Sequence, residues 1–129
     1  GALRVLAARV ASAADLATLA AVDDQDEMVL VRDGTLRLAS DATEITRRFF
    51  ALELEQIAAH LERSPGAVAA EADVAAFATG LAFDPITGMR YDRPTIRLDA
   101  AVGVRTPAFG ALLLPVITTV HVRSVSSPR

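Results

Sequence analysis

The sequence predicts an α+β fold, with a long N-terminal helix and a second helix packed on an antiparallel sheet of three to five strands. Two long segments of the first half lack Gly and Pro and carry apolar residues at three- and four-residue spacing, which indicates helices. Two segments of the second half alternate between apolar and polar residues, which indicates strands with one buried face. A chain of 129 residues corresponds to a single domain, residues 1–129.

The first predicted helix covers residues 2–22, a segment rich in Ala and Leu, which favour helices. Because its apolar stripe is made mostly of small side chains, we expect close packing against another helix or a sheet. The acidic segment 23–27 does not have the spacing of a calcium-binding loop, so it is interpreted as a solvated loop. The stripe consists of Leu3, Leu6, Val10, Ala13, Ala14, Ala17 and Ala20.

The second predicted helix covers residues 41–62, where Asp41 and Glu44 have the spacing of a capping box. Its apolar residues fall on two nearly opposite sides, so we expect this helix to be sandwiched between the first helix and the sheet. One side carries Ile45, Phe49 and Leu52, and the other carries Phe50, Leu54, Ile57 and Leu61. Between the two helices, residues 28–38 form either a short hairpin turning at Asp33-Gly34 or a packed linker.

The strand-rich region covers residues 67–126. Residues 67–82 fit both a helix and a strand, and a strand over 71–83 is favoured because it leads directly into a turn. Residues 95–105 and 116–125 are the two clear strands. In the first, Ile96, Leu98, Ala100, Val102 and Val104 are expected to face inward, and Thr95, Arg97, Asp99 and Arg105 to face water. In the second, one face carries Val116, Val120 and Val122, and the other Ile117, Thr119, His121 and Arg123.

The segment FDPITGMRYDRP, residues 83–94, combines polar residues with two prolines and a glycine. We expect a turn here, in which the Asp84 side chain accepts local backbone N–H groups and Gly88 adopts a positive φ. Tyr91 and Arg93 would then lie on an exposed loop, where they are candidate partner-binding residues.

Composition argues against several classes of function. The net charge is −3 and the 13 basic residues, all arginine, form no stripe, so no nucleic-acid partner is expected. The chain has no cysteine, and His60 and His121, both expected at the surface, are too few for a zinc site. No catalytic motif or phosphate loop is present, so we expect a non-enzyme without metal or cofactor, and a small α+β enzyme is the disfavoured alternative. The longest strictly apolar runs are also too short to span a membrane.

Three segments together carry a resemblance to a known family: RVASAADLATLAAV, DGTLRLASDATEITRRFFALEL, and the region from DPITG to VHVRSV. They resemble the helices and C-terminal strands of TadE/TadG-like minor pilins of tight-adherence (Tad) pilus systems. The resemblance implies a pilin-like domain, without its membrane segment, that lies at the cell surface or outside the cytoplasmic membrane. It implies a structural role in initiating, capping or anchoring a type IV-like pilus and in adhesion.

The resemblance also implies partners: other pilin subunits, bound through the first helix, and the pilus assembly machinery. The membrane would be contacted only through the missing N-terminal segment. The alternative interpretation is a structural component of a phage or secretion apparatus, or a small protein-binding module. The candidate partner-binding residues of the first helix are Leu3, Leu6, Ala7, Val10, Ala14 and Ala17.

Overall fold

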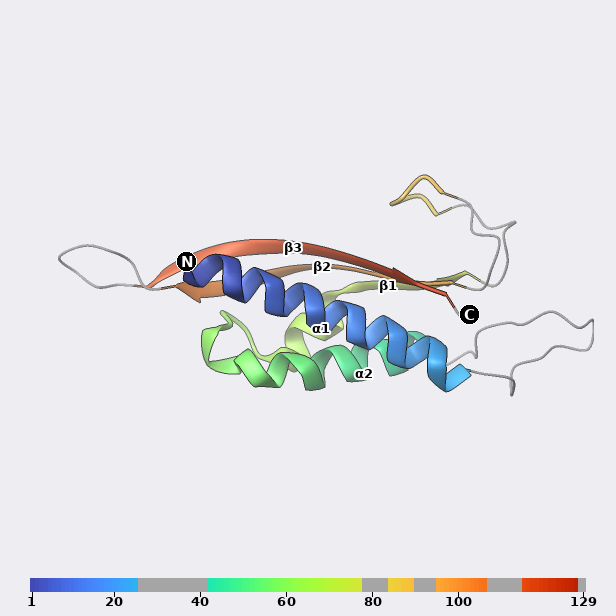
Figure 1. Cartoon of the computed structure of the whole chain (residues 1–129), viewed down its shortest axis with the longest axis horizontal. Coiled ribbons are helices and arrows are strands. Elements are labelled where there is room, and N and C mark those ends of the chain that lie inside the picture. Colours follow the sequence, from blue (N-terminus) through green and yellow to red (C-terminus); the bar gives the residue numbers. More distant parts are fainter. Residues whose placement is uncertain (26–41, 78–83, 90–94, 107–114, 128–129) are drawn as a thin grey trace, which may run out of the picture.

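The computed structural model describes residues 1–25, 42–77, 84–89, 95–106 and 115–127. The fold is α+β, as predicted, with a layer of helices on one face of a three-stranded antiparallel sheet (Figure 1). The elements are α1 (Ala2–Gln25), α2 (Ala42–Leu54), the 3₁₀ helix η2 (Glu55–His60), α3 (Pro65–Glu71), β1 (Asp73–Phe77), β2 (Thr95–Thr106) and β3 (Val116–Ser126).

Helix α1 packs on β3 and β2 and is flanked by α2 (Figure 1). Its buried stripe consists largely of alanines, which permit the helix to lie close to both neighbours. The helix continues through Asp23 and Asp24 to Gln25, so the prediction of an acidic loop starting at residue 23 was wrong for these three positions. The buried residues of the stripe are Leu6, Val10, Ala13, Ala14, Ala17, Ala21 and Val22.

The predicted second helix is divided between α2 and η2, and Leu61 after them has an extended backbone. Phe50, Leu54 and Ile57 are buried, as expected of one of its two apolar sides. The prediction that this helix lies between the first helix and the sheet was wrong, because α1 packs directly on β3 and β2, while α2 lies beside α1 and contacts β1 and β2. As a result, two residues of the second apolar side, Phe49 and Leu52, remain exposed.

The ambiguous segment after Ser64 contains both a helix and a strand. The Ser64 side chain accepts a hydrogen bond from the Ala67 N–H at 3.2 Å, which caps α3, and Pro65 occupies its first turn. The chain then becomes extended as β1, so the strand favoured over 71–83 is confirmed for residues 73–77 and wrong for 71–72. Arg47 of α2 holds this junction by donating to the Ala72 carbonyl at 2.9 Å.

The sheet has the order β1-β2-β3, with Val74 opposite Leu98 and Leu98 opposite Ser124. Its inner face meets the helices, and the five residues of β2 predicted to point inward are all buried. Beyond the N-terminal end of β1, Leu61 forms an antiparallel bridge with Val104 of β2, and the Glu62 N–H donates to the Gly103 carbonyl at 2.9 Å. Central strand β2 is therefore bordered along most of its length.

Several predictions concern residues outside the described part of the chain. These are the hairpin or linker of 28–38, the cap at Asp41, acidic residues 26–27, positions 78–83 of the predicted strand, and the partner-binding residues Tyr91 and Arg93.

Candidate interaction surface

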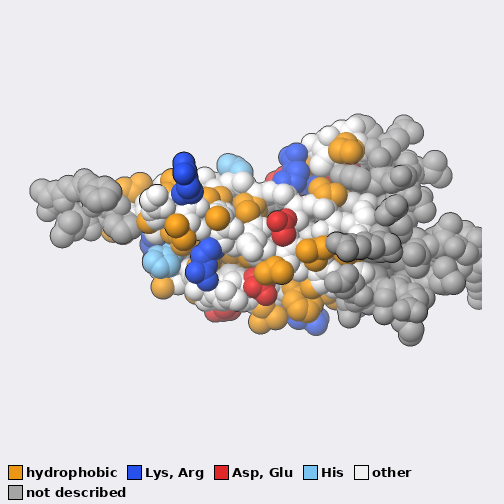
Figure 2. Space-filling view, in the orientation of Figure 1, with side chains coloured by type: hydrophobic (Ala, Val, Ile, Leu, Met, Phe, Trp, Pro, Cys, Tyr) orange, Lys and Arg blue, Asp and Glu red, His pale blue; other side chains and the backbone are white. Residues whose placement is uncertain are grey.

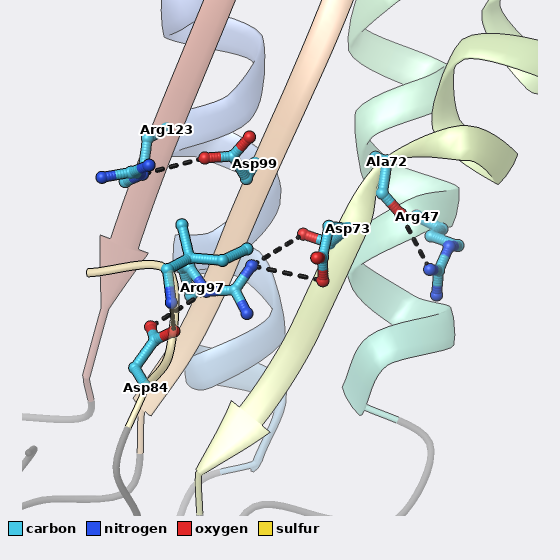
Figure 3. Close-up of polar contacts among 8 residues, drawn as sticks. Arg47, Ala72, Asp73, Asp84, Arg97, Asp99 and Arg123 are labelled. Atoms are coloured by element: carbon cyan, nitrogen blue, oxygen red, sulfur yellow. Dashed lines mark hydrogen bonds and ion pairs between the residues drawn. The ribbon is translucent and has the colours of Figure 1, made fainter. Parts of the chain in front are cut away.

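The outer face of the sheet, away from the helices, carries a buried ion pair. Arg97 of β2 is 2% exposed, and its Nε donates to Oδ2 of Asp84, which is fully buried, at 2.9 Å (Figure 3). Its Nη1 lies 3.2 Å from Oδ1 of Asp73 and 3.3 Å from the Asp73 carbonyl, and the guanidinium lies 5.8 Å from the centre of the Phe77 ring. The expectation that Arg97 faces water was therefore wrong.

The turn at residues 84–89 contributes to this burial, because its Asp84 lies against Arg97 on the outer face of β2. Asp84 Oδ1 accepts the Ile86 N–H at 2.9 Å, and the Gly88 N–H donates to the Asp84 carbonyl at 2.8 Å. Gly88 has φ +72°, a conformation that glycine adopts without strain. Both predictions for this turn are confirmed. The sequence did not reveal that the second oxygen of the Asp84 carboxylate binds Arg97.

Other polar residues of this face are also paired within the domain. Arg123 Nε donates to Asp99 Oδ2 at 2.8 Å (Figure 3). Thr95, which was expected to face water, is buried, and its hydroxyl lies 2.9 Å from that of Ser127. The outer face of the sheet thus has much of its hydrogen-bonding capacity satisfied by the domain itself.

A hydroxyl cluster connects α1 to the inner face of β3. Thr18, fully buried, has its Oγ1 2.9 Å from Ser124 Oγ and 2.8 Å from Ser126 Oγ. Ser124 donates in turn to Asp15 Oδ1 at 2.7 Å. Each hydroxyl has a hydrogen-bond partner in this cluster, so the cluster fixes the helix on the sheet.

Most of the partner-binding residues predicted on the first helix are core residues. Leu6, Val10, Ala14 and Ala17 are each at most 6% exposed, because the same small-residue stripe packs on the sheet and on α2. These four side chains are therefore not available at the surface of this domain. Leu3, at 39% exposure, and the half-buried Ala7 remain accessible on α1.

The outward side of the helix layer exposes large apolar side chains that the sequence analysis did not single out as a site. Leu16 and Leu19 of α1 and Phe49 and Leu52 of α2 are between 36% and 57% exposed. Leu16 of α1 borders the same groove as Glu53 of α2, which follows Leu52 in the sequence. Figure 2 shows hydrophobic side chains gathered over α1 and α2. We refer to these four residues as the helix-layer patch.

A groove between the two helices runs from this patch toward the N-terminal end of α1. Its narrow part, about 170 Å³, is lined by Ser12 and Leu16 on one side and Glu53 on the other. Its wider part, about 380 Å³, lies between the first turns of α1 and η2 and reaches Arg105 of β2. Arg9 and Gln56 line both parts and are joined by a hydrogen bond of 3.4 Å across the groove.

Both histidines are exposed, as predicted, with His60 in η2 and His121 on β3. Within the described ranges no three His, Cys, Asp or Glu side chains are close enough together to hold a metal ion.

By length and composition α1 could cross a membrane over Ala2–Val22, which the short strictly apolar runs did not indicate. In the folded domain 44% of its most apolar stretch is buried.

Comparisons of the chain with models of known protein families, with curated proteins and with solved structures gave no match.

Proposed function

We propose that this chain is the folded domain of a non-enzymatic structural subunit, and that copies or related subunits associate through the helix-layer patch. The observation that carries the proposal is the exposure of four large apolar side chains on two adjacent helices. Several large apolar side chains exposed on one side of a folded domain are typical of protein–protein interfaces. Removal of such side chains from water is a main driving force of association.

The class of subunit that we propose is a TadE/TadG-like minor pilin of a tight-adherence pilus. Its support is the resemblance of three sequence segments, together with an apolar N-terminal helix that packs on an antiparallel sheet. In this proposal the domain lies outside the cytoplasmic membrane and acts in initiating, capping or anchoring the filament. Leu3 and Ala7, which lie on a different side of α1 from Leu16 and Leu19, would form a separate contact with neighbouring subunits.

Sedimentation of the chain over a range of concentrations tests the association. We expect concentration-dependent association that is lost when Leu16 and Leu52 are both replaced by Glu, because a charged side chain would have to be desolvated in the interface. The matched control is Ile117→Glu, which alters an equally exposed apolar residue, 51% exposed, on the outer face of the sheet. Association that survives L16E/L52E and disappears in I117E would assign the interface to the sheet instead.

The gene upstream of the codon for Gly1 tests the pilin assignment separately. A short basic leader followed by about twenty apolar residues, enough to span a bilayer, would support it. An upstream globular domain would exclude it, whatever the result of the sedimentation experiment.

A small protein-binding module is the second candidate function, and strand β3 favours it. In the described part of the chain β3 pairs with β2 on one side only, and it exposes Val116, Ile117 and Val125. An edge strand of this kind can accept an added strand from a partner. Loss of association in I117E but not in L16E/L52E is the result that would favour this function.

A further inference from the structure

The wider part of the groove, at the N-terminal end of α1, has an apolar floor and a cationic rim. The floor consists of the buried Leu6 of α1 and Ile57 of η2, and the exposed Ala2 and Val5 extend it to the surface. The rim carries Arg9 and Arg105, with His60 beside them. None of the described residues that line this part of the groove carries a carboxylate, although the chain as a whole is acidic.

The two arginines are held at the rim and keep hydrogen-bonding capacity. Arg9 Nη2 donates to Gln56 Oε1 at 3.4 Å, and Arg105 Nη2 donates to the Glu62 carbonyl at 3.3 Å. Each bond uses one of the five N–H groups of a guanidinium. The remaining groups are suited to a carboxylate or phosphate, whose oxygens match the geometry of a guanidinium.

The size of the cavity limits what it can hold. At about 380 Å³ it lies near the lower end of the range of roughly 300–1,000 Å³ for small-molecule sites. Such sites are mostly apolar with a few well-placed polar groups, which is the composition found here. One alkyl chain fits this description better than the two chains of a membrane phospholipid.

We propose that this cavity binds a single-chain anionic amphiphile, such as a fatty acid, with its alkyl chain on the Val5–Leu6–Ile57 floor and its carboxylate between Arg9 and Arg105. This site adjoins the helix-layer patch along the same groove, but it does not rest on the proposed role in assembly. Charge complementarity identifies the head group, and the apolar floor identifies the tail.

Titration with octanoate, followed by the methyl NMR signals of Val5, Leu6 and Ile57, tests the proposal. We expect saturable shifts at these methyls and much smaller ones at Leu19 and Leu52. Octyltrimethylammonium, which has the same tail and the opposite charge, is expected not to bind. Equal binding of both probes, or shifts spread over all exposed leucines, would overturn the proposal in favour of nonspecific adsorption.

Variants separate the head-group contact from general hydrophobicity. Arg9→Gln and Arg105→Gln should each weaken octanoate binding by about tenfold or more, since each removes a charge-assisted hydrogen bond. The matched control, Arg48→Gln, removes a charge from an exposed position on α2 that is not part of the cavity lining and should leave the affinity unchanged. An unchanged affinity in the Arg9 and Arg105 variants, with the fold intact by circular dichroism, would overturn the assignment.

Phosphatidylglycerol vesicles distinguish a free amphiphile from a membrane lipid. We expect that vesicles do not compete with octanoate for the three methyl groups. Vesicles that displace octanoate would identify a lipid head group as the ligand and overturn the proposal of a single-chain amphiphile.

Discussion

The outer face of the sheet and the outward side of the helix layer differ in how far the domain itself provides partners for their side chains. On the outer face of the sheet, Arg97 is buried beside Asp84 and Asp73, and Arg123 pairs with Asp99, so charged groups find partners within the chain. On the outward side of the helix layer, Leu16 and Leu52 are exposed and have no such cover.

The difference indicates where a partner is expected. The turn at residues 84–89 already covers part of the sheet and supplies the buried counter-ion of Arg97, so a partner is not needed to satisfy it. Removal of the helix-layer patch from water lowers the free energy, and another molecule is needed to cover it. Stability should therefore depend on the buried contacts of the sheet, and association on the helices.

The largest expected effect is on the buried ion pair. Asp84→Ala should lower the free energy of unfolding by about 3–5 kcal/mol, because it leaves the Arg97 charge buried without its closest counter-ion. Denaturant unfolding measures the change. Asp73→Ala is the matched control, since this carboxylate is 59% exposed and its loss should cost about 0–1 kcal/mol. Equal effects of the two substitutions would contradict the account of this face.

The hydroxyl cluster between the layers is expected to contribute less. Thr18→Val keeps the shape of the side chain but removes the oxygen that lies beside Ser124 and Ser126, so stability should fall by about 1–3 kcal/mol. Thermal unfolding checks this against Thr119→Val, a change at an exposed position of β3 that is expected to stay within about 0.5 kcal/mol. No loss in Thr18→Val would mean that the cluster does not fix α1 on the sheet.

The exposed ion pair of the sheet should have a smaller effect again. In the Arg123–Asp99 pair the side chains are 48% and 31% exposed, so Arg123→Ala should cost about 0–1 kcal/mol, and added salt should reduce the difference. Denaturant unfolding at low and high salt measures both. A salt-independent loss above this range would show that Arg123 acts through packing and not through charge.

The smallest effect concerns a fully exposed pair. The Arg63 guanidinium lowers the pKa of Glu71, mainly through the hydrogen bond between the two side chains. Because the pKa is lower in the folded state, the contribution of this pair is present above the unfolded-state pKa and is lost as the pH falls through the folded-state pKa. Arg63→Gln should return the pKa of Glu71 toward its ordinary value, as NMR titration would show. An unchanged pKa would contradict the assigned cause.

Sequence periodicity predicted the fold correctly where the burial of a side chain depends only on whether its side of the helix or strand faces the other layer. The alternation of β2 identified its inward residues from Ile96 to Val104, and the spacing along α1 identified five of its buried residues, although Leu3 is exposed and Ala20 half-buried. The same method was wrong for Arg97, because a strand pattern does not record that a turn covers the polar face. Asp84 and Gly88 were understood only as parts of a local turn.

The helix-layer patch was harder to predict, because the burial of its side chains depends on which helix packs directly on the sheet. The two-sided apolar pattern of α2 was visible in the sequence, but it led to the prediction that Phe49 and Leu52 are buried inside the domain. The small side chains of α1 permit that helix to pack directly on β3 and β2, with α2 beside it, and Phe49 and Leu52 remain exposed. The sequence feature that could have identified the helix-layer patch was thus an apolar side of a helix that has no partner inside the domain.

Cysteine-specific cross-linking shows whether copies of the chain associate through the helix-layer patch. The chain has no cysteine, so a Leu52→Cys variant carries a single thiol on the patch, and Thr119→Cys carries one on the outer face of the sheet. A short bis-maleimide should link copies of the Leu52→Cys variant efficiently and copies of the Thr119→Cys variant only weakly. Equal linking of both variants, or preferential linking through Thr119→Cys, would contradict association through the helix-layer patch.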